Sequence, residues 1–129
     1  MTLIKRYFNE ILLWVGLFGA YLFTRLYNIM SLPMFTDEAI YTRWSQIARY
    51  DASWRFISLT DGKQPSFVWL DMIIMRFVND PLLAGRLVSV LVGIASLVGI
   101  YFLAREIFKN QRIGYLAAII YIIFPFSIV

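Results

Sequence analysis

The sequence contains no cysteine and no histidine among its 129 residues. Their absence excludes disulfides, thiolate chemistry, Cys/His zinc sites and histidine-based catalytic triads within this chain. Charged residues are also scarce, at 16% of the chain, where ordinary globular domains have about 25%. Any chemistry must therefore use carboxylates, lysine, arginine, tyrosine or hydroxyl groups.

Hydrophobic residues, in contrast, make up 60% of the chain, and the mean hydropathy is +0.69. They fall in long runs separated by short charged stretches, which is the pattern of membrane spans and loops. We therefore predict an all-α, polytopic transmembrane bundle with about four spans, at residues 7–30, 65–79, 82–108 and 113–129. The last run reaches Val129 with no closing polar residue, so we expect the N-terminal part of a larger membrane protein.

The basic residues predict a topology with one conflict. Lys5 and Arg6 favour a cytoplasmic N-terminus in the plasma (cytoplasmic) membrane, which places the loop 31–64 on the outer face. Four alternating spans would then put the basic segment 105–112 outside, against the positive-inside rule. Either the helix after Pro65 does not fully cross the membrane, or later parts of the protein override the rule.

The loop 31–64 is too apolar for a disordered linker and contains an amphipathic pattern. Apolar residues recur at helical spacing, which predicts a helix with an aromatic face lying in the membrane interface. These residues are Ile40, Tyr41, Trp44, Ile47 and Ala48. The loop therefore lies at the depth of the lipid headgroups.

The acidic pair Asp37-Glu38 at the start of this helix has two interpretations. In the first interpretation, Thr36 is the N-cap and the two acids in the first turn are favoured by the helix dipole. The capping box is then incomplete, because Ala39 occupies the position where Glu is expected. Alternatively, a carboxylate at a membrane surface acts as a general base or binds a hard cation. Lys63, before the helix-starting Pro65, is either an interfacial lysine or a cation that meets a lipid phosphate.

Three further charges lie in or beside apolar helices. Asp71 and Arg76 are five residues apart and need not pair with each other, so structural pairing with other helices is the default. A transporter would instead use them as a polar pathway. Arg86 opens the third predicted span, as a topology-setting arginine or as half of an ion pair that shapes the site.

The order of these motifs resembles a known family. Residues 35–41 read FTDEAIY, residues 63–66 read KQPS, and residues 84–89 read AGRLVS at the start of a glycine-containing helix. This order is similar to the N-terminal part of the GT-C membrane glycosyltransferases, in the branch of protein O-mannosyltransferases and the lipid A aminoarabinose transferase. The resemblance covers nearly all of the chain but only the first third or less of a typical member.

The resemblance implies roles for individual residues. Asp37 matches the catalytic aspartate and Glu38 its neighbour in the acidic signature of the active site. Lys63 matches the lysine that approaches the lipid phosphate, although Gln64 replaces a proline of the usual Lys-Pro-Pro. Arg86 matches a recurrent arginine, which we place with Lys63 as a lipid-phosphate ligand.

The implied reaction is inverting transfer of a sugar from a polyprenyl-phosphate donor to a hydroxyl of a protein, lipid or glycan acceptor. A divalent metal ion, with Asp37 as one ligand, is the only cofactor that the family implies, and no nucleic acid is expected as a partner. Because the later parts of a family member are absent, we expect this chain alone to be inactive. The alternatives are a small non-enzymatic membrane subunit that packs against a larger partner, or a transporter fragment.

Overall fold

A computed structural model describes residues 2–27 and 29–124, with the backbone alone for residues 2–6. The described residues form helices and turns with no strand, and 79% are helical. This confirms the all-α fold class. The elements in chain order are α1 (Thr2–Leu26), α2 (Thr36–Tyr50), η1 (Ala52–Trp54), η2 (Ile57–Asp61), α3 (Ser66–Ile74), α4 (Pro81–Phe108) and α5 (Gln111–Ile123).

Among the described residues, two helical segments are long and apolar enough to cross a membrane. They are Tyr7–Leu26 of α1 and the whole of α4. They lie where the first and third spans are predicted, although α1 ends four residues short of residue 30. The fourth predicted span corresponds to α5, whose 13 described residues extend about 20 Å. Its last predicted residues, 125–129, lie outside the described part of the chain.

The second predicted span differs most from the structure. Helix α3 has nine residues and ends at Ile74, where 65–79 was expected to be helical throughout. Its length of about 14 Å covers only half of a hydrocarbon core of about 30 Å. The chain turns at residues 75–77 and restarts as α4, whose first amides at Leu82 and Leu83 are capped by Asp80. Apolar composition therefore predicted a longer helix than the backbone forms.

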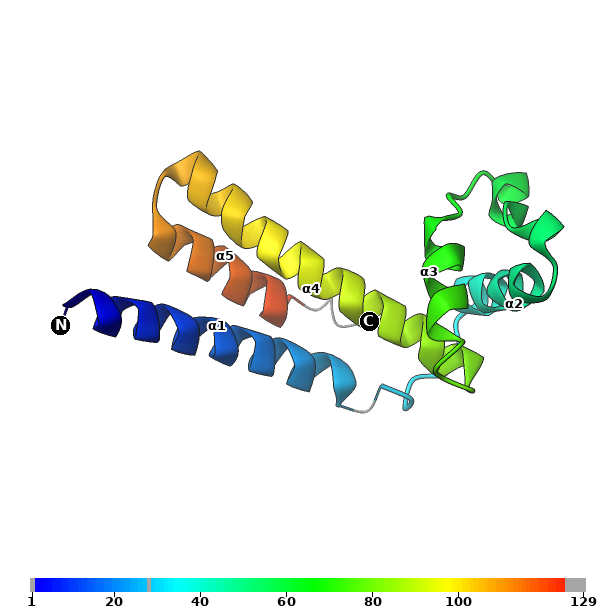
Figure 1. Cartoon of the computed structure of the whole chain (residues 1–129), viewed down its shortest axis with the longest axis horizontal. Coiled ribbons are helices and arrows are strands. Elements are labelled where there is room, and N and C mark those ends of the chain that lie inside the picture. Colours follow the sequence, from blue (N-terminus) through cyan, green and yellow to red (C-terminus); the bar gives the residue numbers. More distant parts are fainter. Residues whose placement is uncertain (1, 28, 125–129) are drawn as a thin grey trace. The chain divides into compact units, whose positions relative to one another are not determined.

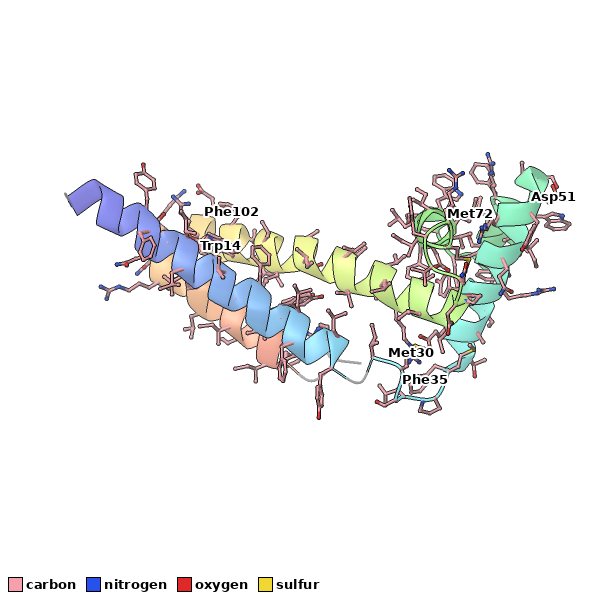
Figure 2. The ribbon with its side chains drawn as sticks, turned by 60° about the horizontal axis from the view of Figure 1, so that its bottom comes forward. Trp14, Met30, Phe35, Asp51, Met72 and Phe102 are labelled. Carbon is pink, nitrogen blue, oxygen red and sulfur yellow. The ribbon has the colours of Figure 1, made fainter. Side chains whose placement is uncertain are left out.

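The described residues divide into two compact units. The first unit contains α1, residues 92–108 of α4, and α5. Trp14 of α1, labelled in Figure 2, packs its ring edge-on against Tyr101 of α4 at 4.7 Å and lies 6.2 Å from the Tyr115 ring of α5. One turn earlier in α1, Glu10 accepts a hydrogen bond from Gln111 at 3.2 Å. The N-terminal half of α1 therefore lies beside the turn that joins α4 to α5.

The other end of the first unit fixes the helix directions. A Cβ atom on Gly93 would collide with the Tyr21 hydroxyl, and the Tyr21 ring stacks with Tyr121 at 6.3 Å. Residues 14 and 21 thus meet α4 in descending order, and residues 10, 14 and 21 meet α5 in ascending order. Helix α4 is antiparallel to α1, and α5 is parallel to it (Figure 1).

Glycine permits the close approach of helices in this unit at Gly93 but plays no such part at Gly99. A Cβ on Gly99 would meet nothing within 4 Å, whereas a Cβ on Gly114 would lie 2.9 Å from the Tyr101 carbonyl oxygen. Gly114 therefore joins Gly93 as a position where a side chain would force the helices apart.

The second unit comprises residues 28–91 and carries every predicted site residue. Phe35 and Asp51, labelled in Figure 2, mark the two ends of α2, and α3 packs along the helix. The face that α2 buries is made of small residues, Thr42, Ser45 and Ala48. The larger residues Tyr41 and Trp44 remain only partly buried, which leaves them free to shape the site.

Candidate active site

Helix α2 begins one residue earlier than the sequence suggested. The N-cap is Phe35 rather than Thr36, so Glu38 and not Ala39 occupies the third helical position. The Glu38 carboxylate accepts a long hydrogen bond of 3.4 Å from the Phe35 amide, which is the acidic half of a capping box. This corrects the expectation that the capping box fails at this helix.

Glu38 is held mainly by Arg86 from the first turns of α4. Arg86 Nε donates to Glu38 Oε1 at 2.7 Å, and Nη2 donates to Oε2 at 3.0 Å, which is the bidentate geometry of a strong arginine–carboxylate pair. The two side chains are 11% and 25% exposed. The hydrogen bonds from Arg86, together with its positive charge, lower the pKa of Glu38 below its ordinary value despite partial desolvation.

Arg86 also fixes the segment that precedes α2. Its Nη1 donates to the Ile29 carbonyl oxygen at 2.5 Å, and its Nη2 donates to that of Leu32 at 3.0 Å. All three guanidinium nitrogens thus bond protein acceptors. Binding of a lipid phosphate by Arg86 stays a prediction, and these bonds use four of its five guanidinium N–H groups. The alternative role, an ion pair that shapes the site, is the one for which the geometry is present.

Lys63 is presented by a tight turn. Gly62 ends η2 in the left-handed region with φ of 67°, where a side chain would be strained. The next amide, that of Lys63, donates back to the Ser58 carbonyl oxygen at 3.0 Å. The reversal directs the lysine side chain toward α2, immediately before Pro65 and α3.

The Lys63 ammonium lies between two carboxylates and two aromatic rings. Its Nζ is 3.4 Å from Asp37 Oδ1 and 3.3 Å from Asp61 Oδ2. It also lies 5.1 Å from the ring centroid of Tyr41 and 5.6 Å from that of Trp44, within cation–π range. We call Lys63, Asp37, Asp61, Tyr41 and Trp44 the lysine cluster. Asp61 first and then Asp37 raise the pKa of Lys63, so the ammonium is charged at neutral pH.

The structure brings Asp37 and Lys63 together, 26 residues apart in sequence, whereas Glu38 pairs with Arg86. The sequence pattern did not point to Asp61, and it placed Tyr41 and Trp44 on a helix face in the membrane interface. The spacing of residues 37, 41 and 44 places them on one face of a helix, and this signal could have found the cluster.

Asp37 is expected as a metal ligand, and the residues around it can be tested for that role. Mg²⁺ and Ca²⁺ need about six or more oxygen ligands, and the described residues contain no group of three or more His, Cys, Asp or Glu side chains placed to hold a metal. The cation that lies between Asp37 and Asp61 is the Lys63 ammonium. The donor set of the lysine cluster does not fit a metal ion without displacement of Lys63.

Asp71 has a different environment from the one expected. It is fully buried in the second unit, and its carboxylate faces Gly85, where an added Cβ would lie 3.9 Å from both oxygens. Neither oxygen has a well-formed hydrogen bond, because the neighbouring Ser45 hydroxyl donates to the Tyr41 carbonyl oxygen at 2.9 Å. Arg76 is exposed and forms no ion pair with any described residue. The two charges do not form a continuous polar path in this unit.

Comparison with known families decides the class of protein. Residues 62–129, just over half of the chain, match the family described as dolichyl-phosphate-mannose-protein mannosyltransferases. The chain belongs to this family. No curated protein and no solved structure matches it. The matched range includes Lys63 and Arg86, whereas Asp37 and Glu38 precede it.

Membership confirms the resemblance to GT-C glycosyltransferases and, with the apolar helices, an integral membrane protein. It also sets aside the non-enzymatic subunit and the transporter, because the family is one of glycosyltransferases.

Proposed function

We propose that the lysine cluster is part of the active site of a membrane glycosyltransferase, which transfers a sugar from a polyprenyl-phosphate donor to an acceptor hydroxyl. The observation that carries this proposal is the positioned ammonium of Lys63 in direct contact with the exposed carboxylate of Asp37. The family description names a mannosyl lipid phosphate and a protein acceptor. We therefore propose mannose as the sugar and a protein hydroxyl as the first acceptor to test.

Asp37 and Lys63 would serve opposite ends of a single displacement. The acceptor oxygen attacks the anomeric carbon, and its proton passes to the Asp37 carboxylate. The bond from that carbon to the phosphate oxygen breaks, and its electron pair leaves with the lipid phosphate. Lys63 neutralises the departing phosphate as a compact point charge. One displacement at the anomeric carbon inverts its configuration.

The distance within the lysine cluster requires a movement before reaction. A separation of 3.4 Å between Asp37 Oδ1 and Lys63 Nζ cannot hold an acceptor oxygen, the anomeric carbon and a phosphate oxygen in line, because each hydrogen-bonded contact alone takes about 2.7–3 Å. Donor binding must therefore exchange the Asp37–Lys63 contact for a phosphate–Lys63 contact. Asp61 and the two rings can keep the ammonium in place while Asp37 is released.

The packing of the first unit supports one orientation in the membrane. Helices α1 and α4 are antiparallel, and α3 is too short to cross between them. We propose that the chain crosses outward with α1, inward with α4 and outward again with α5. The basic segment 105–112 then lies on the same side as Lys5 and Arg6, as the positive-inside rule requires, and the lysine cluster lies on the outer face.

Cysteine labelling tests this orientation directly, because the chain has no cysteine of its own. We expect Thr60→Cys, on the exposed surface of η2, to react with a membrane-impermeant maleimide added to intact cells. Asn110 and Gln111 lie in the turn between α4 and α5, and Asn110 is exposed. We expect Asn110→Cys and Gln111→Cys to react only after the cells are opened. Labelling of residues 110 and 111 in intact cells would contradict the proposed crossings.

The donor-phosphate role of Lys63 is the test of the proposed function. We expect Lys63→Gln to weaken binding of a short polyprenyl phosphate about 10- to 100-fold, because a hydrogen bond from a charged donor contributes about 1.5–3 kcal/mol. Binding would be measured with the protein in lipid nanodiscs. Lys109→Gln is the matched control, since Lys109 pairs with Glu106 on the exposed end of α4. Equal affinities for the wild type and Lys63→Gln would overturn the assignment.

A further inference from the structure

A cleft lies toward the C-terminal end of α2, away from Asp37 at its N-terminal end. It has a volume of about 510 Å³ and is formed by the C-terminal half of α2, the residues after it, and the connection between α3 and α4. Its α2 residues include Arg43, Ile47 and Tyr50, which share a face of the helix that differs from the face of Asp37, Tyr41 and Trp44. The cleft is therefore separate from the lysine cluster, and its size suits a small ligand.

The cleft carries two guanidinium groups that lack carboxylate partners. Arg43 and Arg49 both line it, and neither forms an ion pair with a residue that the structure describes. Arg49 Nη1 donates to the Met75 carbonyl oxygen at 2.6 Å, which orients its guanidinium at the wall of the cleft. Arg43 Nη1 donates a long hydrogen bond of 3.4 Å to Gln46 Oε1. Unpaired, oriented arginines favour an anion, and their planar fork matches phosphate geometry.

The one carboxylate on the lining does not neutralise these arginines. Asp51 Oδ1 accepts hydrogen bonds from the Ser53 amide at 2.9 Å and from the Ser53 hydroxyl at 2.7 Å. These bonds lower the pKa of Asp51 and tie it to the first turn of η1. Asp51 keeps its negative charge, but its hydrogen bonds are made to Ser53, so the two arginines leave the lining with a net positive charge.

The rest of the lining is amphiphilic. Gln46 and Asn79 add amide donors beside the arginines, whereas Ile47, Met75 and Val78 add apolar surface. Trp54 lies at the cleft and is half-exposed, as is typical of an indole at the boundary between lipid and water. A phosphate attached to an apolar body matches this combination better than a free ion does.

We infer that this cleft binds the phosphate of an anionic membrane lipid, with Arg43 and Arg49 as its ligands. The site is independent of the proposed transfer reaction and would hold the C-terminal half of α2 against the bilayer surface. Its ligand differs in role from the donor lipid, because it remains bound and is not consumed.

The test is lipid binding by the protein in phosphatidylcholine nanodiscs, titrated with a short-chain phosphatidylglycerol and followed by native mass spectrometry. We expect one tightly retained phosphatidylglycerol in the wild type and about tenfold weaker retention in Arg43→Gln. Arg43→Lys should recover only part of that loss, because lysine keeps the charge but not the bidentate fork. Arg43→Gln keeps the Arg49–Met75 bond, so it preserves the local fold.

Three results would overturn the inference. Arg55→Gln is the matched control, since Arg55 is exposed and does not line the cleft. An equal loss in Arg55→Gln would show that general surface charge, and not the cleft, attracts the lipid. Equal retention of phosphatidylcholine, whose phosphate is balanced by a quaternary ammonium, would show that the cleft does not select an anionic lipid. Full competition by inorganic phosphate at the affinity of the lipid would assign the cleft to free phosphate instead.

Discussion

In a form of the protein that transfers sugar, the Asp37→Asn variant should do so about 100- to 10,000-fold more slowly than the wild type, because it removes a general base without changing the side-chain shape. The same substitution removes one of the two carboxylates that contact Lys63. The ammonium would keep Asp61 and both aromatic rings as partners. We therefore expect polyprenyl phosphate to bind Asp37→Asn a few-fold more tightly, since the phosphate no longer competes with Asp37 for Lys63.

This combination of slower transfer and tighter donor binding distinguishes a base from a structural residue. The measurements are single-turnover transfer from a mannosyl polyprenyl phosphate and equilibrium binding of the donor phosphate to the same preparation. Glu106→Gln controls for the loss of one negative charge, because Glu106 is exposed at the end of α4. Transfer at the wild-type rate by folded Asp37→Asn would reject Asp37 as the base. Weaker donor binding would reject the competition within the lysine cluster.

Asp61→Asn separates the two carboxylates of the cluster. Asp61 contacts Lys63 at 3.3 Å but comes from η2, and Asp37 comes from α2. If Asp37 alone takes the proton, we expect Asp61→Asn to slow transfer by less than tenfold, through a less firmly held ammonium. A larger loss than in Asp37→Asn would exchange the roles of the two residues.

The sequence pointed to two members of the lysine cluster, Asp37 and Lys63, but not to Asp61. Asp37 and Lys63 were identified as candidates from their residue types and from the resemblance, and the structure places them in contact. Asp61 carried no signal except its nearness to Lys63 in sequence, because an Asp-Gly pair is also an ordinary turn. The long-range partners depend on how η2 folds back toward α2, which no local pattern reports.

Some of the helices could be predicted from the sequence and others could not. The long apolar runs predicted α1 and α4, because length and hydropathy are sufficient to recognise such helices. They failed for 65–79, where the composition is apolar but the helix stops after nine residues. Of the buried face of α2, Ala48 was on the predicted apolar face, but Thr42 and Ser45 were missed, because they are small and polar and add nothing to a hydrophobic stripe. Tertiary packing against α3 selects these residues, and hydropathy does not record it.

The Glu38–Arg86 pair carries the second large expected effect, on stability. Arg86→Gln would leave a partly buried carboxylate without its cation and the carbonyl oxygens of Ile29 and Leu32 without a donor. Breaking such a pair costs about 3–5 kcal/mol when it is fully buried, so we expect about 3 kcal/mol for this partly exposed one. Thermal unfolding in detergent measures the loss, and Arg76→Gln, which removes an exposed arginine with no ion pair among the described residues, should change stability by less than about 0.5 kcal/mol.

The pH dependence gives an independent check on this pair. Because the pKa of Glu38 is lowered from its ordinary 4.5, the unfolded chain takes up a proton before the folded one does as the pH falls. The stabilisation is therefore complete above about pH 4.5 and is lost as the pH falls through the folded-state pKa. Glu38→Gln should remove that dependence, and the double variant with Arg86→Gln should show coupling well above 0.5 kcal/mol.

The alternative role of Arg86, as a lipid-phosphate ligand, predicts a different unfolding temperature for Arg86→Lys. If Arg86 serves the donor phosphate, Arg86→Lys should unfold at nearly the wild-type temperature and bind polyprenyl phosphate with similar affinity, because the charge is kept. If Arg86 is the clamp that the geometry shows, Arg86→Lys can keep one contact to Glu38 but not the bonds to both Ile29 and Leu32. We therefore expect a lower unfolding temperature for Arg86→Lys. Donor affinity measured below that temperature should stay close to that of the wild type, because the contacts of Lys63 with Asp37 and Asp61 do not involve Arg86.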